Sequence, residues 1–462
     1  MKQTDNNLKP PSHPPRKEKG GLRARFWLWF CRAVVWAFYR RHEVEGRERI
    51  PKHGPLVICA NHPSALVDAV ILQWVSPRLV HPLARSGLFR NPLVRPLLSM
   101  IRAVPVHRQQ DVGSDTSRNV DMFERCYEML ESGGALLIFP EGVTHSQPQL
   151  QKLKTGAARL ALGYLARTGE KPVVLPVGLN FSEAGRFRSS VLVRVGDPLS
   201  ITIHPTESEE DATRRITEEI REGLVAVTIN LETWDEMDIL RRLERFFALR
   251  RGRYRHRDLK QRFRSLQKLR DTWKRLEQQA PTLLNGAVRH LDAFERMCAK
   301  AGVKDYHLTI NYTPRLVAQF LMRSLATLAL LFPLAIWGAL NSYIPFMLSR
   351  HLALRLSHDR YHYDTAKISF ALFLFPGFWG VQTALMYQWS GTAVAWGYAL
   401  MLLPSAMVAQ FMRRERRRLT ENIKVFMLFL WRRELRVMLE LQREQLEKEL
   451  ARLARLAKRK MS

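Results

Sequence analysis

A histidine and an aspartate follow an apolar run that is typical of a buried strand. His62 comes two positions after Leu56–Ala60, and Asp68 follows six positions later, where we expect a helix to begin. A neutral imidazole can take a proton from a hydroxyl group near pH 7, and a carboxylate on its other nitrogen fixes the tautomer and stabilises the imidazolium. This is the logic of a Ser-His-Asp triad in which a substrate hydroxyl replaces the serine. Alone, a pair at this spacing is more often structural than catalytic.

Three later stretches place polar or charged residues where strands are expected to end. They are Val104–Arg108, Ile138–Ser146 and Val174–Asn180. Functional sites of α/β sheets gather at the ends of strands. The residues of chemical interest within these stretches are Arg108, Glu141, Gly142 and Pro176. With the first pair they form four blocks in a fixed order, which is a much more specific signal than the pair alone.

Taken in this order, the four blocks resemble those of the glycerophosphate/lysophosphatidate acyltransferase superfamily. The resemblance covers roughly residues 46–200. It implies an α/β acyltransferase domain with a mixed sheet flanked by helices. It also implies that His62 is the catalytic base and that Asp68 is its partner.

The same resemblance implies roles in substrate binding for four other residues. Arg108 matches an arginine that contacts the substrate phosphate, and a guanidinium fork suits a phosphate dianion. Glu141 and Gly142 match the acid and glycine that are attributed to acceptor binding. Pro176 matches a proline that is attributed to shaping the acyl-donor site.

The first block departs from the common pattern of the family. Five residues, Pro63–Val67, separate His62 from Asp68, where the common form has four. A bulge at the strand-to-helix junction can absorb the extra residue, and the role of Asp68 is the first to fail if it does not. A five-residue spacer also occurs in a branch similar to the fungal glycerol-3-phosphate/dihydroxyacetone-phosphate acyltransferases, which shares the continuation Ser146–Arg159. This likeness favours the same acceptors here.

The sequence gives no sign of a resident cofactor or metal. It has no Walker loop, GxGxxG fingerprint or GxSxG elbow, so we expect neither a nucleotide cofactor nor a covalent serine intermediate. Its four cysteines are scattered without a CxxC pair, which argues against a zinc site and a disulfide framework. We expect them to be small buried hydrophobic residues. Acyl-CoA or acyl carrier protein would then be a co-substrate.

The formal net charge of +30 requires anionic partners. Long apolar segments in the same chain favour membrane lipid, since each Lys or Arg near an anionic leaflet contributes about 1 kcal/mol. No zinc finger, basic zipper or RNP motif is present, so nucleic acid is not an expected partner. We also expect an acyl thioester donor and a glycerol-phosphate-type acceptor.

The N-terminal part divides into three segments. Residues 1–20 are polar and rich in Pro and Lys, which predicts a disordered tail. Residues 21–45 include Phe26–Tyr39, an aromatic-rich run that is interrupted by Arg32 and too short to span a bilayer. It favours an interfacial membrane helix, although a soluble amphipathic helix that covers the next domain is an alternative. Residues 46–205 carry the α/β pattern of the catalytic domain.

The C-terminal part is predicted to be mostly helical and membrane-embedded. Residues 206–315 form a basic helical region in which Phe246, Leu249 and Phe263 interleave with cations, so a membrane-facing helix competes with an ordinary solvated one. Within residues 316–412, the uncharged runs Ile368–Tyr387 and Gly391–Met412 predict a helical hairpin with both basic flanks in the cytoplasm. Ser324–Ser349 then becomes a re-entrant or bent element.

A basic C-terminal helix is expected over residues 413–462. Its leucines at Leu439, Leu446 and Leu453 indicate either a short coiled coil or packing onto the rest of the chain. Because both flanks of the hairpin are basic, the catalytic domain is placed on the cytoplasmic face of a membrane.

The resulting hypothesis is a membrane-bound O-acyltransferase of phospholipid synthesis. It would transfer a fatty acyl group from an acyl thioester to glycerol 3-phosphate or dihydroxyacetone phosphate. The alternative that keeps the fold is a lysophosphatidate or lysophospholipid acyltransferase that acts on the second hydroxyl. A non-catalytic membrane scaffold is less favoured, because all four blocks keep their charged residues.

Overall fold

The computed structural model describes residues 22–64, 66–90, 95–107, 119–145, 147–183, 188–204, 206–250, 258–310, 312–356 and 360–459. The chain separates into two compact units, Met1–Trp234 and Asp235–Ser462. The expected tail over residues 1–20 and the predicted phosphate ligand Arg108 lie outside the described residues.

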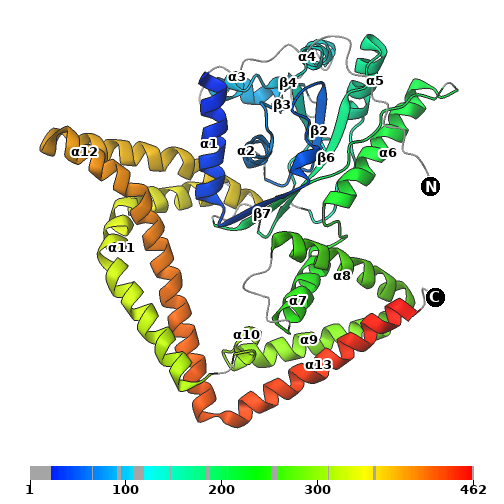
Figure 1. The fold of residues 1–462 in the computed structure, drawn as a ribbon. Coiled ribbons are helices and arrows are strands. Elements are labelled where there is room, and N and C mark those ends of the chain that lie inside the picture. The colour runs from blue at the N-terminus through cyan, green and yellow to red at the C-terminus, as the bar shows by residue number, and fades with distance from the viewer. Residues whose placement is uncertain are drawn as a thin grey trace. The chain divides into compact units, whose positions relative to one another are not determined.

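The first unit alternates short strands with helices (Figure 1). Its strands are β1 Arg41–Glu45, β2 Leu56–Ala60, β3 His81–Arg85, β4 Val104–Val106, β5 Ala135–Ile138, β6 Val173–Phe181 and β7 Ser190–Val195. Its helices are α1 Leu22–Phe38, α2 Leu66–Val75, α3 Arg95–Met100, α4 Asn119–Glu131, α5 Gly156–Thr168 and α6 Glu209–Val227, with short 3-10 turns η1 Arg47–Arg49 and η2 Ser86–Arg90.

The strands form one seven-stranded sheet in the order β1-β7-β6-β2-β5-β3-β4. Every pair is parallel except β6 with β7, which is antiparallel. Leu56 at the start of β2 pairs with Ala135 of β5 on one side and with Val173 of β6 on the other. The predicted mixed sheet flanked by helices is confirmed. The register also brings the carboxyl ends of β2 and β5 together at one edge.

Helices cover both faces of the sheet. One face packs against α4, α5 and α6 through a core that includes Leu130, Ala161 and Ile216. The other face packs against α1 and α2, where Val35 and Ile71 are buried. Burying one such aliphatic side chain contributes about 1.5–3 kcal/mol, which explains why the central strands are almost wholly apolar.

Helix α1 has a buried side and an exposed aromatic side. Trp27, Cys31 and Val35 recur at helical spacing and are buried. The exposed side carries three large aromatic residues: Phe26, Trp29 and Trp36. The buried side of α1 therefore packs in the core of the first unit, as expected for a soluble amphipathic helix that covers the next domain. Its aromatic outer side agrees with the interfacial expectation, which remains a prediction.

The four cysteines are free and buried. Burial raises the pKa of the Cys31, Cys59, Cys126 and Cys298 thiols to about 12. Their thiols are protonated at neutral pH, and their burial confirms the expectation that they are small buried hydrophobic residues.

The second unit is entirely helical among its described residues. It comprises α7 Trp234–Arg250, α8 Leu259–Gln279, α9 Pro281–Lys300, α10 Asp305–Leu308, α11 Pro314–Leu356, α12 Arg360–Trp431 and α13 Arg433–Arg459. Phe246, Leu249 and Phe263 are buried in its core. They therefore do not form a membrane-facing side.

Two helices of this unit are long and apolar enough to cross a membrane, over Pro314–Arg355 and Phe370–Trp431. Residues 324–349 are part of the continuous helix α11, and α12 changes direction at Gly391, where φ is 77°. Helices α11 and α12 lie side by side (Figure 1). The number of spans and their orientation remain predictions.

The C-terminal leucine stripe packs inside the chain. Leu439, Leu446 and Leu453 are buried, and α13 lies against α9 and α8. Of the two alternatives for this stripe, packing onto the rest of the chain is the one observed.

Candidate active site

The histidine and aspartate of the first block meet at the carboxyl edge of the central strands. Nδ1 of His62 lies 3.0 Å from Oδ2 of Asp68. The same oxygen accepts a 2.7 Å hydrogen bond from the backbone N–H of Ser64. The five-residue spacer therefore does not separate the pair. Because Asp68 lies in the first turn of α2, the dipole of this helix also favours a negative charge there.

Asn61 fixes the exit of β2 against the neighbouring strand. Its side chain donates to the carbonyl of Leu179 over 3.1 Å and accepts from the N–H of Leu179 over 2.7 Å. These two hydrogen bonds tie the first residue after β2 to the backbone of β6. No role for Asn61 was predicted from the sequence. Its position immediately before His62 was the only signal in the sequence.

Asp68 is fully buried, and this determines its electrostatics. Burial raises the pKa of its carboxyl above the ordinary value, while the hydrogen bond to His62 opposes that shift. Its second oxygen, Oδ1, has no hydrogen-bond partner among the described residues. The charged carboxylate is therefore costly to bury and is held mainly by His62 and the amide of Ser64.

The ring of His62 is held on one face by an aromatic side chain. Phe139 stacks on the imidazole with a centroid distance of 3.9 Å and an interplanar angle of 17°. Since Nδ1 donates to a carboxylate, the lone pair of the neutral ring is on Nε2. No hydrogen bond engages Nε2 within the described part of the chain, and the side chain is 14% exposed. His62 is therefore set up to accept a proton from an incoming group.

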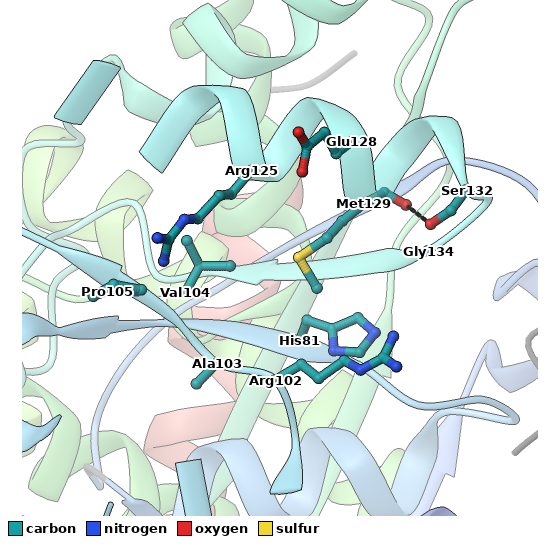
Figure 2. A pocket seen from close by; sticks show the side chains of 10 residues that line it. All are labelled: His81, Arg102, Ala103, Val104, Pro105, Arg125, Glu128, Met129, Ser132 and Gly134. Carbon is teal, nitrogen blue, oxygen red and sulfur yellow. Dashed lines mark hydrogen bonds between the residues drawn. The ribbon is translucent and has the colours of Figure 1, made fainter. Parts of the chain in front are cut away.

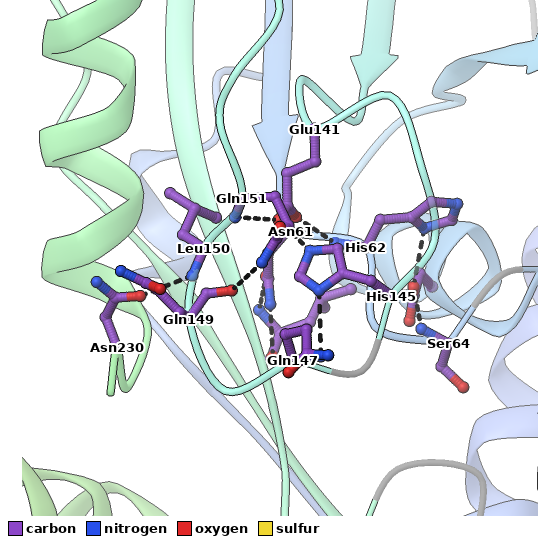
Figure 3. A network of polar contacts seen from close by, with 12 residues as sticks. Asn61, His62, Ser64, Glu141, His145, Gln147, Gln149, Leu150, Gln151 and Asn230 are labelled. Carbon is purple, nitrogen blue, oxygen red and sulfur yellow. Dashed lines mark hydrogen bonds and ion pairs between the residues drawn. The ribbon is translucent and has the colours of Figure 1, made fainter. Parts of the chain in front are cut away.

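Glu141 of the third block lies beside the dyad in a dense polar network (Figure 3). One carboxylate oxygen accepts the backbone N–H of His62 over 3.1 Å. The other accepts the N–H of Gln151 over 2.9 Å and also contacts Nε2 of His145. The structure thus brings Glu141 next to His62, although 79 positions separate them in the chain.

Gly142 follows with a φ of +72°, in the left-handed region. Its N–H donates to the carbonyl of Phe139, which closes a tight turn. A Cβ at this position would lie 3.4 Å from Cγ of Lys154. Glycine is therefore required here mainly by the backbone of the turn.

Pro176 lies inside β6 rather than at the edge of the sheet. It pairs in register with Cys59 and is buried. Its ring packs so closely on Gly196 and Gly223 that a Cβ at either glycine would approach within 2.9 Å. The structure therefore places Pro176 in the core against α6, and its predicted effect on the donor site would have to act through β6.

These residues belong to a segment that matches a known family. Residues 41–180 match the family model described as Acyltransferase. The chain contains an acyltransferase domain. This confirms the resemblance drawn from the four blocks, and the domain includes His62, Asp68 and Glu141.

Relatives of the acyltransferase domain include glycerolipid enzymes. Glycerol-3-phosphate O-acyltransferase 1 of Saccharomyces cerevisiae is 22% identical over 310 residues, 47% of this chain and 41% of that protein. Glycerol-3-phosphate O-acyltransferase 2 of the same yeast is 29% identical over 134 residues, 28% of this chain and 18% of that protein. The chloroplastic 1-acyl-sn-glycerol-3-phosphate acyltransferase LPAT1 of Arabidopsis thaliana is 29% identical over 167 residues, 36% of this chain and 42% of that protein. The chain therefore spans less than half the length of each.

A separate hollow of about 320 Å³ lies at the opposite edge of the acyltransferase domain (Figure 2). It is lined by the first residues of β3 and β4, His81 and Val104, and by Arg102, Arg125 and Met129. The dyad does not line it. No group of three or more His, Cys, Asp or Glu side chains among the described residues is arranged to hold a metal ion.

Proposed function

We propose that this chain transfers a fatty acyl group from an acyl thioester to the hydroxyl of glycerol 3-phosphate or dihydroxyacetone phosphate at a membrane surface. The observation that carries the proposal is the dyad geometry. Asp68 holds Nδ1 of His62 at 3.0 Å, and this leaves Nε2 as the only basic atom of the ring. The relatives named glycerol-3-phosphate O-acyltransferases support the choice of acceptor.

In the proposed reaction, Nε2 of His62 takes the proton of the acceptor hydroxyl as its oxygen attacks the thioester carbonyl. A C–O bond forms, and the C–S bond of the tetrahedral intermediate then breaks. The imidazolium returns its proton to the leaving thiolate. Asp68 stabilises the imidazolium through Nδ1 while the charge exists. The reaction balances without any cofactor, and the thioester is consumed as co-substrate.

Substrate binding is assigned from the resemblance. Arg108 would contact the phosphate of the acceptor, because a guanidinium matches phosphate geometry. Membrane association is supported by the two long apolar helices α11 and α12 and by the exposed aromatic side of α1. Location of the catalytic domain on the cytoplasmic side follows from the charge of the flanking loops.

The alternative acceptor is lysophosphatidate. The relative from Arabidopsis thaliana is named for that reaction, and it matches 36% of this chain. Both acceptors offer a hydroxyl near a phosphate, so the dyad chemistry is the same for either. The two acceptors differ in that lysophosphatidate already carries one acyl chain and offers its second hydroxyl, whereas glycerol 3-phosphate carries no acyl chain.

The test is acyl transfer by the purified full chain in detergent. Radiolabelled acyl-CoA is offered with glycerol 3-phosphate, dihydroxyacetone phosphate or lysophosphatidate in separate reactions, and acyl carrier protein loaded with the same labelled acyl group is offered as a second donor. His62→Ala should lower the rate by about 10²–10⁴-fold, the usual contribution of a general base. His53→Ala, an exposed histidine before β2, is the matched control. Equal rates for His62→Ala and wild type would overturn the mechanism, and transfer only to lysophosphatidate would overturn the acceptor.

A further inference from the structure

The carboxylate of Glu141 is completely occupied by groups of this chain. Its side chain has no exposed surface. Its two oxygens accept N–H groups from His62, Gln151 and His145. A phosphate offers only acceptor atoms and negative charge, so a buried carboxylate that is already saturated is a poor ligand for it.

His145 holds the far side of that carboxylate in a fixed tautomer. The backbone N–H of Gln147 points at its Nδ1 over 3.2 Å, so Nδ1 is the acceptor atom of the ring. The ring proton is then on Nε2, which donates to Glu141. Both nitrogens are used, so His145 has no lone pair to offer to a substrate (Figure 3).

The same segment also contacts the other side of His62. The backbone N–H of His145 donates to the carbonyl of His62 over 3.3 Å. The peptide groups before and after the His62 side chain are therefore both tied to residues 141–145. Phe139, two positions before Glu141, stacks on the imidazole itself.

We propose that Glu141 and His145 form a clamp that positions the catalytic base, rather than a site for the acceptor. His145 aligns Glu141, and Glu141 holds the backbone N–H of His62. The clamp fixes where Nε2 points when the hydroxyl arrives. This inference rests on the proposed function of His62, and it changes the role that the resemblance gives to Glu141.

The clamp makes a kinetic prediction that an acceptor site does not. His145→Leu removes the donor to Glu141, whereas His145→Gln keeps an amide N–H that can replace it. Displacing a catalytic group by about 1 Å can cost on the order of 10²-fold in rate. We therefore expect His145→Leu to lower kcat by about 10–100-fold, with KM for the acceptor within about twofold. His145→Gln should restore most of kcat, and Glu141→Gln should behave like His145→Leu.

Thr144→Ala is the matched control, because Thr144 precedes His145 and is exposed. It should leave kcat and KM unchanged. A rise in KM for the acceptor at unchanged kcat, in Glu141→Gln or in His145→Leu, would overturn the clamp and restore the acceptor role.

A second measurement does not depend on activity. Hydrogen–deuterium exchange of the full chain in detergent should be faster in the peptide that contains the His62 amide in His145→Leu, because Glu141 protects that amide. Peptides from β7 should exchange as in wild type. Unchanged exchange at His62 would overturn the clamp. Failure of wild type to transfer any acyl group would instead sink the proposed function, while the exchange result would still decide the clamp.

Discussion

Nδ1 of His62 and Oδ2 of Asp68 are 3.0 Å apart although five residues lie between them. The spacer includes a turn in which the N–H of Val67 donates to the carbonyl of Ser64. The N–H of Ser64 in turn donates to Asp68, which is the third residue of α2. The five-residue spacer therefore still allows the two side chains to meet, and its last two residues, Leu66 and Val67, already belong to α2.

Asp68→Asn should separate activity from stability. The asparagine is nearly the same size but cannot stabilise an imidazolium as a carboxylate does. In triad enzymes the equivalent change lowers kcat by about 10⁴-fold, and we expect a loss of about 10³-fold or more here. Acyl transfer at saturating acceptor measures it. A variant that kept more than about a tenth of the wild-type kcat would remove Asp68 from the mechanism.

The difference in stability between wild type and Asp68→Asn should depend on pH. Burial raises the pKa of Asp68 in the folded chain above its ordinary value in the unfolded chain. At a pH between these two values, the carboxyl is protonated in the folded chain and ionised in the unfolded chain. The contribution of Asp68 to stability is therefore fully present below the unfolded-state pKa and is lost as the pH rises through the folded-state pKa. Asparagine does not titrate. The melting temperature of Asp68→Asn should therefore equal or exceed that of wild type near pH 8, and the difference should shrink towards pH 4. A difference that grew on acidification would contradict the raised pKa.

Gly142→Ala should destabilise the turn that carries Glu141. The residue has a φ of +72°, which costs an alanine about 1–2 kcal/mol. The melting temperature and the free energy of unfolding should fall accordingly. Gly156→Ala is the control, since Gly156 begins α5 and a Cβ there would meet no atom within 4 Å. It should be neutral or stabilising, because alanine favours helix. Equal effects of the two changes would show that the left-handed turn is not maintained in solution.

The central strands could be predicted from the sequence because both of their faces are buried. Leu56–Ala60 and Ala135–Phe139 are continuous apolar runs, and they appear as β2 and β5. Two strands, β1 and β3, were not predicted, and β4 was expected only as a strand that ends within Val104–Arg108. Arg41–Glu45 is polar because it lies at the edge of the sheet, and β3 and β4 are short and contain proline. These segments are extended because they pair with neighbouring strands, and not because their own residues strongly favour β-structure.

The site was predicted only in part for a related reason. His62 and Asp68 are near each other in the sequence, so their pairing could be expected. The contact of Glu141 with the backbone of His62 depends on β2 and β5 being neighbours. The contacts of that carboxylate with two main-chain N–H groups and with the ring of His145 have no signature in residue types, so a role for Glu141 could be taken only from the resemblance.

The aromatic side of α1 should lie in the headgroup zone of a membrane. A single cysteine at Trp36, labelled with an environment-sensitive dye, should show blue-shifted emission when the full chain is reconstituted into vesicles that contain anionic lipid. The four native thiols do not compete for the label, because they are buried with pKa values near 12. Glu48→Cys, at an exposed position in η1, is the control and should report water. The same emission at both positions would show that α1 does not contact the bilayer.

Gly338 should control the packing of α11 against α12. A Cβ at this position would lie 2.2 Å from the backbone carbon and oxygen of Ser405, so the two helices touch there through their backbones. Small residues allow such close approach of helices in membranes. Gly338→Val should therefore lower the melting temperature in detergent, with a loss of about 1–3 kcal/mol or more from overpacking. Gly397→Val is the matched control, since a Cβ at Gly397 in α12 would meet no atom within 4 Å. If both variants melted alike, the contact between Gly338 and Ser405 would not hold the helices together, whereas a selective loss would identify it as the closest point of their packing.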